Sequence, residues 1–232
     1  MCYTRDVMTI CIAALYENGK GFVLASDLMT TAHFPIGYEF EREDVEKIIK
    51  ITESAEVYAL IAGDVFFANA AIEKAREQAK GQGINIVDGI AELVRSSYQD
   101  IRRERVVRGE LEPRGLNISS YYQNHQKLLP NIVQMIDKSF VSYNPGVELI
   151  IAGRGETGCH LFTVSNPGQC LCHDAIGYTA IGSGAPHAIY SLMDSNYEKS
   201  LNKAKVIDLV NKAKERSQVA PGVGAKTKSI SI

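Results

Sequence analysis

The alternation of apolar and polar positions predicts two strand pairs in the first third of the chain. An apolar, partly β-branched segment over residues 9–15 is followed by an Asn-Gly-Lys-Gly turn at 18–21 and a second apolar segment over 22–25. This pattern is typical of a buried β-hairpin, which here opens the fold. A second pair of strands is predicted over 47–51 and 57–62.

Helical patterns occupy the middle of the chain. Residues 64–80 are good helix formers that end at a Gly-Gln-Gly sequence, and apolar residues recur at helical spacing over 90–101. Residues 109–115 contain two glycines and a proline, so they predict a loop. An amphipathic helix is predicted over 128–140, restarting at Pro130.

The second half of the chain returns to strands. Segments 147–151, 159–164 and 169–173 are separated by Gly-rich and Asn-Pro-Gly turns, which predicts a three-stranded meander. Two helical segments follow the Gly-Ser-Gly sequence at 182–184, and residues 229–232 form a closing strand. The predicted order is therefore strands, helices, strands, helices and strand.

This order predicts an α+β fold. Strands that follow strands, with helices arriving in pairs, favour antiparallel sheets covered by helices over alternating parallel βαβ units. Two stacked antiparallel sheets between two helical layers, a four-layer αββα sandwich, satisfy the order. The 232 residues, 45% of them hydrophobic, can form one sizeable core, and no boundary between two domains is visible.

Composition excludes several classes of partner. The formal charge of −2 and the pI near 6.2 give no general attraction to nucleic acid or to anionic membranes. No apolar run reaches the roughly 18 residues of a membrane span, and residues 1–7 lack the pattern of a signal peptide, so we expect a cytoplasmic protein. Five cysteines without a framework spacing are expected to be reduced thiols.

Residues 8–14, the hairpin and the Leu-Ala-Ser-Asp sequence at 24–27 together resemble the start of a proteasome β-type subunit. In that family of N-terminal-nucleophile hydrolases, a threonine exposed by removal of the preceding residues begins the first strand, and an acid ends the second. The similarity continues through 46–51, 61–63 and 181–186 and into the last helix. It covers nearly the whole chain in the same order, and it implies the Ntn-hydrolase form of the αββα sandwich.

The resemblance also divides the chain. Residues 9–232 correspond to the proteasome β-like domain, and the region near 109–130 is longer than the usual connection between the central helices, as expected of an insertion. Residues 1–8 are then a leader or propeptide, unless translation starts at Met8. We favour the second route, because removal of an initiator methionine before a small residue would expose Thr9.

Five site residues are implied by the resemblance. Thr9 would be the nucleophile, Asp27 the acid beside it, and Lys47 the basic neighbour. Ser183 would support the terminal amine with its hydroxyl. The amide of Gly63 would donate to the oxyanion.

Three further residues are implied to bind substrate. Thr31 matches the threonine that pairs with the substrate backbone, while Ile61 and Val65 would line an apolar specificity pocket. The expected substrate is therefore a peptide or protein.

The chemistry explains why these residue types are needed together. A threonine hydroxyl is a poor nucleophile until a base takes its proton, and a chain-terminal threonine carries that base as its own α-amine. The amine titrates near 7.7 to 8.0 in model peptides, and a nearby lysine lowers that pKa. Lys47 fits this role, and Asp27 is its expected counter-charge, since an unpaired buried ammonium is costly.

The chain departs from the family pattern after its last long helix. The family usually has an aspartate and a serine there, both helping to hold the terminal amine, whereas this chain has Ser217 near the first position and Ala220 or Pro221 near the second. Met29 stands where the family often has arginine. These departures keep a second hypothesis open, namely a non-catalytic structural subunit of a proteasome-like assembly.

Other motifs have simpler interpretations. The G-x-G-x-x-G match over 153–158 is followed by a strand pattern and not by the helix of a dinucleotide site, so we predict a hairpin turn. Cys170, Cys172 and His173 have neither CxxC nor CxxCH spacing, so we expect buried thiols. Cys2 could be an exposed nucleophile, but the apolar strand begins too far after it.

The sequence thus predicts a threonine peptidase or amidase that degrades proteins through an acyl-enzyme on Thr9. The resemblance implies a ring-shaped homo-oligomer and leaves open an ATP-dependent unfoldase as a partner. No cofactor and no metal ion are expected in this chemistry.

Overall fold

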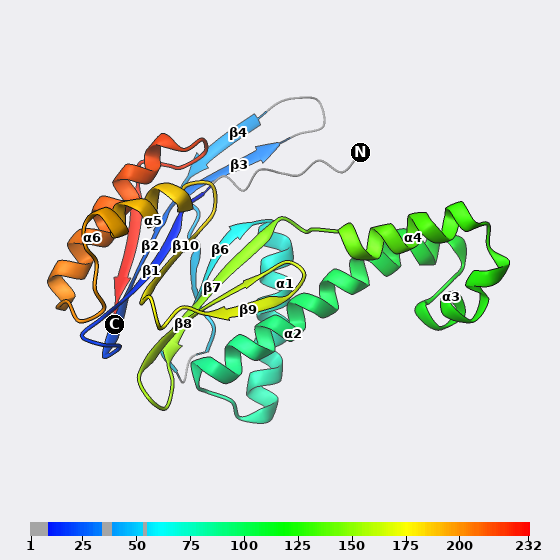
Figure 1. Cartoon of the computed structure of the whole chain (residues 1–232), viewed down its shortest axis with the longest axis horizontal. Helices are drawn as coiled ribbons and strands as arrows, with labels where there is room; N and C mark the ends of the chain where they lie inside the picture. The colour runs from blue at the N-terminus through cyan, green and yellow to red at the C-terminus, as the bar shows by residue number, and fades with distance from the viewer. Residues whose placement is uncertain (1–8, 34–38, 53–54) are drawn as a thin grey trace.

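Two antiparallel sheets, stacked face to face, form the centre of the structure (Figure 1). The structure is a computed structural model, and it describes residues 9–33, 39–52 and 55–232. One pair of helices covers the outer face of each sheet, which gives four layers (Figure 1). The α+β sandwich predicted from the sequence is therefore confirmed.

The first sheet has the order β10-β1-β2-β11. β1 (Cys11–Tyr16) and β2 (Gly21–Asp27) form the predicted hairpin, and every residue of both strands is buried because both faces of the sheet are covered. The predicted closing strand is β11 (Thr227–Ser231), which pairs with β2. β10 (Tyr178–Ile181), which was not predicted, pairs with β1.

The second sheet has the order β5-β6-β7-β8-β9. β5 (Ile48–Lys50) and β6 (Val57–Gly63) are the predicted second strand pair. β7 (Val147–Arg154), β8 (Cys159–Ser165) and β9 (Gln169–Cys172) are the predicted meander. The G-x-G-x-x-G match joins β7 to β8 as a hairpin turn, as predicted.

A two-stranded ribbon extends beyond the first sheet (Figure 1). It consists of β3 (Met29–His33) and β4 (Glu39–Glu43), and neither strand was predicted. β3 follows β2 after a single residue, so the ribbon leads away from the edge at which β2 ends.

Four helices complete the layers. α1 (Val65–Gln82) and α2 (Val87–Val106) pack on the second sheet, and α5 (Ala185–Asp194) and α6 (Lys203–Arg216) pack on the first. Among the described residues, no helix is long and apolar enough to span a bilayer.

A separate apolar layer joins the two sheets. Its members point inward from both sheets and include Leu24, Leu60, Ile150 and Leu161, each with 0% of its surface exposed. Burying a side chain of this size contributes roughly 1.5–3 kcal/mol. This layer holds the sheets in register, so it fixes the relative positions of residues that the two sheets contribute to one edge.

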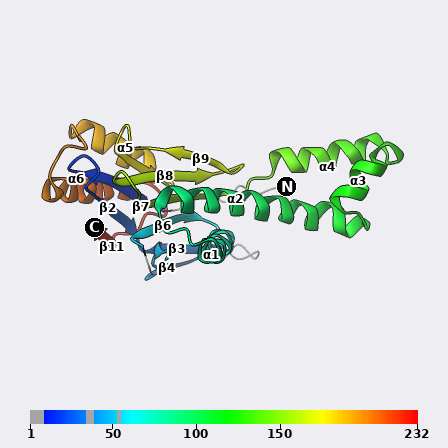
Figure 2. The ribbon, with the colours of Figure 1, turned by 90° about the horizontal axis from the view of Figure 1, so that it is seen from below.

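The chain after α2 forms an arm that projects from the body (Figures 1 and 2). We define the arm as residues 107–146. The sequence predicted a loop over 109–115, and that prediction is wrong. Pro113 sits in the first turn of a short 3-10 helix, where its missing N–H is not needed, and Gly115 ends that helix with a φ of 69°. The helical elements of the arm are a π-helical turn (Val107–Leu111), a 3-10 turn (Glu112–Arg114), α3 (Ile118–Asn124), a second 3-10 turn (His125–Lys127) and α4 (Pro130–Ser142).

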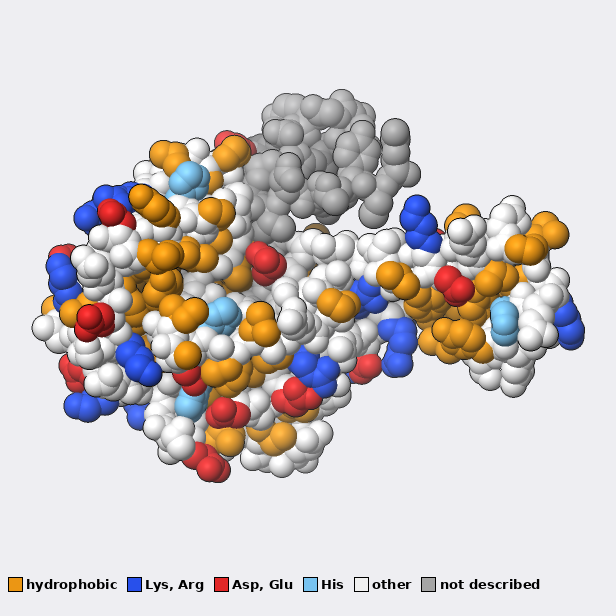
Figure 3. All heavy atoms as spheres, viewed as in Figure 1, with side chains coloured by type: hydrophobic (Ala, Val, Ile, Leu, Met, Phe, Trp, Pro, Cys, Tyr) orange, Lys and Arg blue, Asp and Glu red, His pale blue; other side chains and the backbone are white. Residues whose placement is uncertain are grey.

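The arm has a small core of its own. Leu111, Tyr121 and Ile136 are buried against one another, and the Tyr121 hydroxyl donates to Asp137 Oδ1 at 2.8 Å. Hydrophobic side chains also gather on its surface (Figure 3), among them Val141, which is 83% exposed. Because this core is separate from the three clusters of the body, the arm can lose packing without the body doing so.

We predict that Ile136→Ala destabilises the arm and leaves the body folded. Truncating a buried isoleucine costs about 2–5 kcal/mol. The other two buried side chains of the arm core, Leu111 and Tyr121, cannot offset that loss. Hydrogen exchange should show lost protection over 107–146 and unchanged protection in β1, β2, β6 and β7. Met135→Ala is the matched control, because Met135 is 41% exposed. Equal loss of protection in the body would contradict a separate arm core.

Candidate active site

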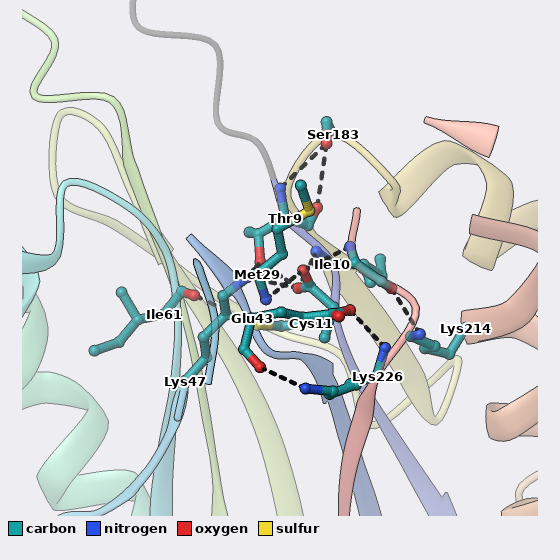
Figure 4. Close-up of polar contacts among 12 residues, drawn as sticks. Thr9, Ile10, Cys11, Met29, Glu43, Lys47, Ile61, Ser183, Lys214 and Lys226 are labelled. Atoms are coloured by element: carbon teal, nitrogen blue, oxygen red, sulfur yellow. Dashed lines mark hydrogen bonds and ion pairs between the residues drawn. The ribbon is translucent and has the colours of Figure 1, made fainter. Parts of the chain in front are cut away.

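Thr9 and Asp27 meet at one edge of the first sheet. Thr9 lies just before β1 and Asp27 is the last residue of β2, and the antiparallel register pairs Cys11 with Ser26. The Thr9 hydroxyl, at Oγ1, donates to Asp27 Oδ1 at 2.6 Å (Figure 4). Both residues are buried. The hairpin alone therefore brings the predicted nucleophile and the predicted acid together.

Lys47 reaches this pair from the second sheet. It directly precedes β5, and its Nζ lies 2.6 Å from Asp27 Oδ1 and contacts Thr9 Oγ1 (Figure 4). The Lys47 side chain is 7% exposed and that of Asp27 is 0% exposed. A buried charge of this kind requires a partner of opposite sign, and each residue provides it for the other.

Both oxygens of the Asp27 carboxylate accept hydrogen bonds. Oδ1 accepts the two hydrogen bonds from Thr9 and Lys47 and a third from Ile10 N at 3.1 Å. Oδ2 accepts from Met29 N at 3.1 Å and from Gly224 N at 3.0 Å. The carboxylate is therefore fixed in orientation, and it fixes the Thr9 hydroxyl in turn.

Ser183 holds the backbone of Thr9. Thr9 N donates to Ser183 Oγ at 3.2 Å (Figure 4). Ser183 Oγ also lies 3.1 Å from Pro221 O. Gly184 N donates to Thr9 O at 3.1 Å. At Gly182, a Cβ would lie 2.4 Å from Thr9 O, and its φ is +95°, so this close approach requires glycine. Three of the residues predicted beside Thr9, namely Asp27, Lys47 and Ser183, are thus in contact with it.

The loop after α6 differs from the predicted family pattern. Ser217, near the position of the family's aspartate, is buried, and its Oγ donates to Ala213 O at 2.8 Å within its own helix. The nitrogen of Thr9 donates to Ser183 and not to Ser217. Pro221 contributes through its backbone carbonyl, which lies 3.1 Å from Ser183 Oγ.

Lys214 is a site residue that sequence reasoning missed. Its side chain is buried, and Nζ donates to Gly224 O at 2.8 Å and to Ala225 O at 2.6 Å (Figure 4). These bonds fix the loop from which Gly224 N donates to Asp27. Burial lowers the pKa of Lys214, while the charges of Asp27 and Glu43 act in the opposite direction. The available signal was a lysine that continues an apolar row at i, i+4 spacing after Val206 and Val210.

The remaining predicted residues lie around this centre. Gly63 ends β6, and Cys11 Sγ, two residues after Thr9, donates to Ile61 O at 3.4 Å across the sheets. The Ile61 side chain is 3% exposed and packs on the helix side of its sheet, away from Thr9. Val65 is half-buried at the start of α1.

Thr31 lies in β3, where its backbone pairs with Glu41. The oxyanion role of Gly63 and the substrate-binding roles of Thr31, Ile61 and Val65 remain predictions.

The described cysteines differ in exposure. Cys11 is buried, and burial raises the pKa of its thiol to about 12, with Lys47 acting against that rise. Cys170 is half-buried and Cys172 is exposed, so the expectation that both are buried thiols is wrong for Cys172. Cys172 is the last residue of β9, the edge strand of its sheet, where it is less covered than Cys170. Within the described ranges, no three His, Cys, Asp or Glu side chains are grouped as metal ligands.

The fold and the residues at this edge of the first sheet indicate the class of protein. Two stacked antiparallel sheets between helix pairs, with a threonine entering the first strand, are the α+β arrangement of N-terminal-nucleophile hydrolases. A family model described as "Proteasome subunit" matches residues 116–218, which include Ser183 and the helices of the first sheet. This match supports membership of the proteasome subunit family, as the resemblance predicted. No curated protein matches the chain.

We predict that iodoacetamide at pH 8 alkylates Cys172 and leaves Cys11 unmodified in the native protein. The thiolate is the reactive form, and a thiol with a pKa of about 12 holds very little of it at pH 8. Peptide mapping by mass spectrometry measures both sites. The control is the same reaction in denaturant, where Cys11 should react fully. Rapid native alkylation of Cys11 would contradict the buried geometry.

Proposed function

We propose that this chain is a threonine peptidase or amidase in which Thr9, freed of residues 1–8, is the nucleophile. The observation that supports this most strongly is the contact of Thr9 Oγ1 with both Asp27 Oδ1 and Lys47 Nζ. A buried hydroxyl between an acid and a base is the arrangement expected of an activated nucleophile. The family match supports a proteasome-type hydrolase.

The reaction begins with the α-amine of the freed Thr9. This amine takes the hydroxyl proton, Oγ1 attacks the carbonyl carbon of a peptide bond, and a tetrahedral oxyanion forms. The C–N bond then breaks, the amine product leaves with the transferred proton, and an ester on Thr9 remains. Water hydrolyses the ester, which releases the acid product and restores the hydroxyl.

The neighbouring groups have separate roles in this scheme. Lys47 lowers the pKa of the amine by its positive charge and stabilises the negative charge that develops on Oγ1. Asp27 compensates Lys47 and orients the hydroxyl. Ser183 holds the nitrogen that becomes the amine. An N–H donor at the oxyanion, for which Gly63 is the candidate, is worth about 2.7–4 kcal/mol.

The substrate in this proposal is a peptide or protein. Its backbone would pair along β3 at Thr31, with Ile61 and Val65 bordering the specificity pocket. Proteasome subunits assemble into oligomeric rings, and the family match indicates the same for this chain. We propose a homo-oligomeric ring that degrades proteins in the cytoplasm, with an ATP-dependent unfoldase as the partner that would supply unfolded chains.

One observation favours a second function. The Ser217 hydroxyl donates to Ala213 O within its own helix, and Ala220 has no hydroxyl. Two groups that the family uses to hold the terminal amine are therefore missing. A subunit of this kind could serve as a non-catalytic part of the ring. The two functions differ in the first residue of the native protein, since catalysis requires Thr9 at the terminus.

We predict that an electrophile directed at N-terminal threonine adds its own mass to Thr9 and leaves Thr9→Ala unlabelled. Intact mass before labelling should show a chain that begins at Thr9. Thr157→Ala is the matched control, because Thr157 is exposed on the β7–β8 turn, and it should be labelled like the wild type. A native chain that still begins at Met1 and takes no label would favour the structural subunit.

We predict that Lys47→Met slows the labelling of Thr9 by about 10²-fold or more, since charge stabilisation at the nucleophile is lost. Lys50→Met, which changes an exposed lysine at the end of β5, should label at the wild-type rate. The rate constant of labelling, with circular dichroism to confirm folding, measures the effect. An unchanged rate in Lys47→Met would remove Lys47 from the mechanism.

A further inference from the structure

Glu148 places a carboxylate next to the site, and the proposed function does not use it. It is the second residue of β7, pairs with Ala62 beside Gly63, and is half-buried. Its Oε2 accepts a hydrogen bond from Gly182 N at 3.1 Å. Gly182 is packed directly against Thr9 O, so one residue separates this carboxylate from the nucleophile.

The strand order places Glu148 on a definite side of Thr9. In the first sheet, β1 lies between β2, which ends with Asp27, and β10, which leads to Ser183. In the second sheet, β6 lies between β5, which follows Lys47, and β7, which carries Glu148. The ion pair and Glu148 therefore flank Thr9 on opposite sides.

The two sides differ in charge. Asp27 and Lys47 compensate each other. Among the described residues, no lysine, arginine or histidine forms an ion pair with Glu148. The arginines at the base of the arm are engaged elsewhere: Arg102 donates to Phe140 O at 2.9 Å, and Arg105 pairs with Asp64 at 3.0 Å. Within the part of the chain that the structure describes, Glu148 thus carries a negative charge without a cationic partner, and Oε1 accepts no hydrogen bond there.

We propose that Glu148 recognises a positive charge on the leaving side of the cleaved bond, so that the site prefers peptides with lysine or arginine immediately after that bond. The inference rests on the proposed function. The acyl part of the substrate lies along β3, on the side of Asp27 and Lys47. The leaving amine therefore passes Ser183 and Glu148, where a guanidinium or ammonium group finds its counter-charge.

The test uses three internally quenched peptides that differ in one residue, which is arginine, alanine or glutamate immediately after the cleaved bond. The wild type should show a kcat/KM ratio of roughly five- to tenfold in favour of arginine, the size expected of one half-buried charge pair. Glu148→Gln keeps an acceptor for Gly182 N and removes the charge, so the ratio should fall to about one. Glu148→Lys should favour a peptide with glutamate at that position.

Glu156→Gln is the control for net charge, because Glu156 is exposed on the turn at the far end of β7 and should keep the wild-type ratio. Electrophile labelling of Thr9 separates the two hypotheses. A wild type that labels but does not discriminate, or a Glu148→Gln variant with an unchanged ratio, overturns the role of Glu148. A wild type that neither labels nor cleaves refutes the proposed function, and the inference with it.

Discussion

The buried ion pair between Asp27 and Lys47 is the interaction on which the site depends, because it joins the two sheets at the edge where Thr9 lies. Removing two charges from water costs several kcal/mol for each, and geometry must offset that cost. Here Asp27 supplies the counter-charge and accepts five hydrogen bonds, from Thr9, Ile10, Met29, Lys47 and Gly224. Loss of either partner would leave an uncompensated charge between the sheets. The chemistry of the site therefore requires the same sheet packing that stabilises the fold.

A second buried cation, Lys214, stabilises the loop that contacts the Asp27–Lys47 ion pair. Lys214 has no carboxylate within ion-pair distance in the described ranges and binds two backbone carbonyls of the loop that follows α6. That loop gives Asp27 one of its donors, and its Pro221 carbonyl contacts Ser183. The loop lacks the family's side chains at these positions. Its backbone contacts Asp27 and Ser183 instead, and a buried ammonium keeps that backbone in place.

Most secondary-structure elements and half of the site could be predicted from patterns in the sequence. The hairpin, the meander and the helix pairs could be predicted because glycine-rich turns separate apolar segments of clear period, and the hairpin by itself brings Thr9 to Asp27. Lys47 and Ser183, which also contact Thr9, lie 38 and 174 residues from it along the chain. No local sequence pattern encodes contacts between such distant residues, so only the resemblance to the family indicated them. The arm was predicted only in part, because its proline and glycines mark the ends of short helical turns as well as loops. Lys214 was missed because a lysine in an apolar row usually reaches solvent.

In the proposed mechanism, depth along one strand decides which of two potential nucleophiles reacts. Thr9 and Cys11 are two residues apart, so alternation directs both side chains into the space between the sheets. The thiol is intrinsically the better nucleophile, but it lies further inside, donates to Ile61 O, and is kept protonated by burial. The hydroxyl lies at the edge, where a cation, a carboxylate and the backbone nitrogen of the same residue are held around it. In the proposed mechanism, reactivity at this edge thus follows from what surrounds each atom and not from its intrinsic nucleophilicity.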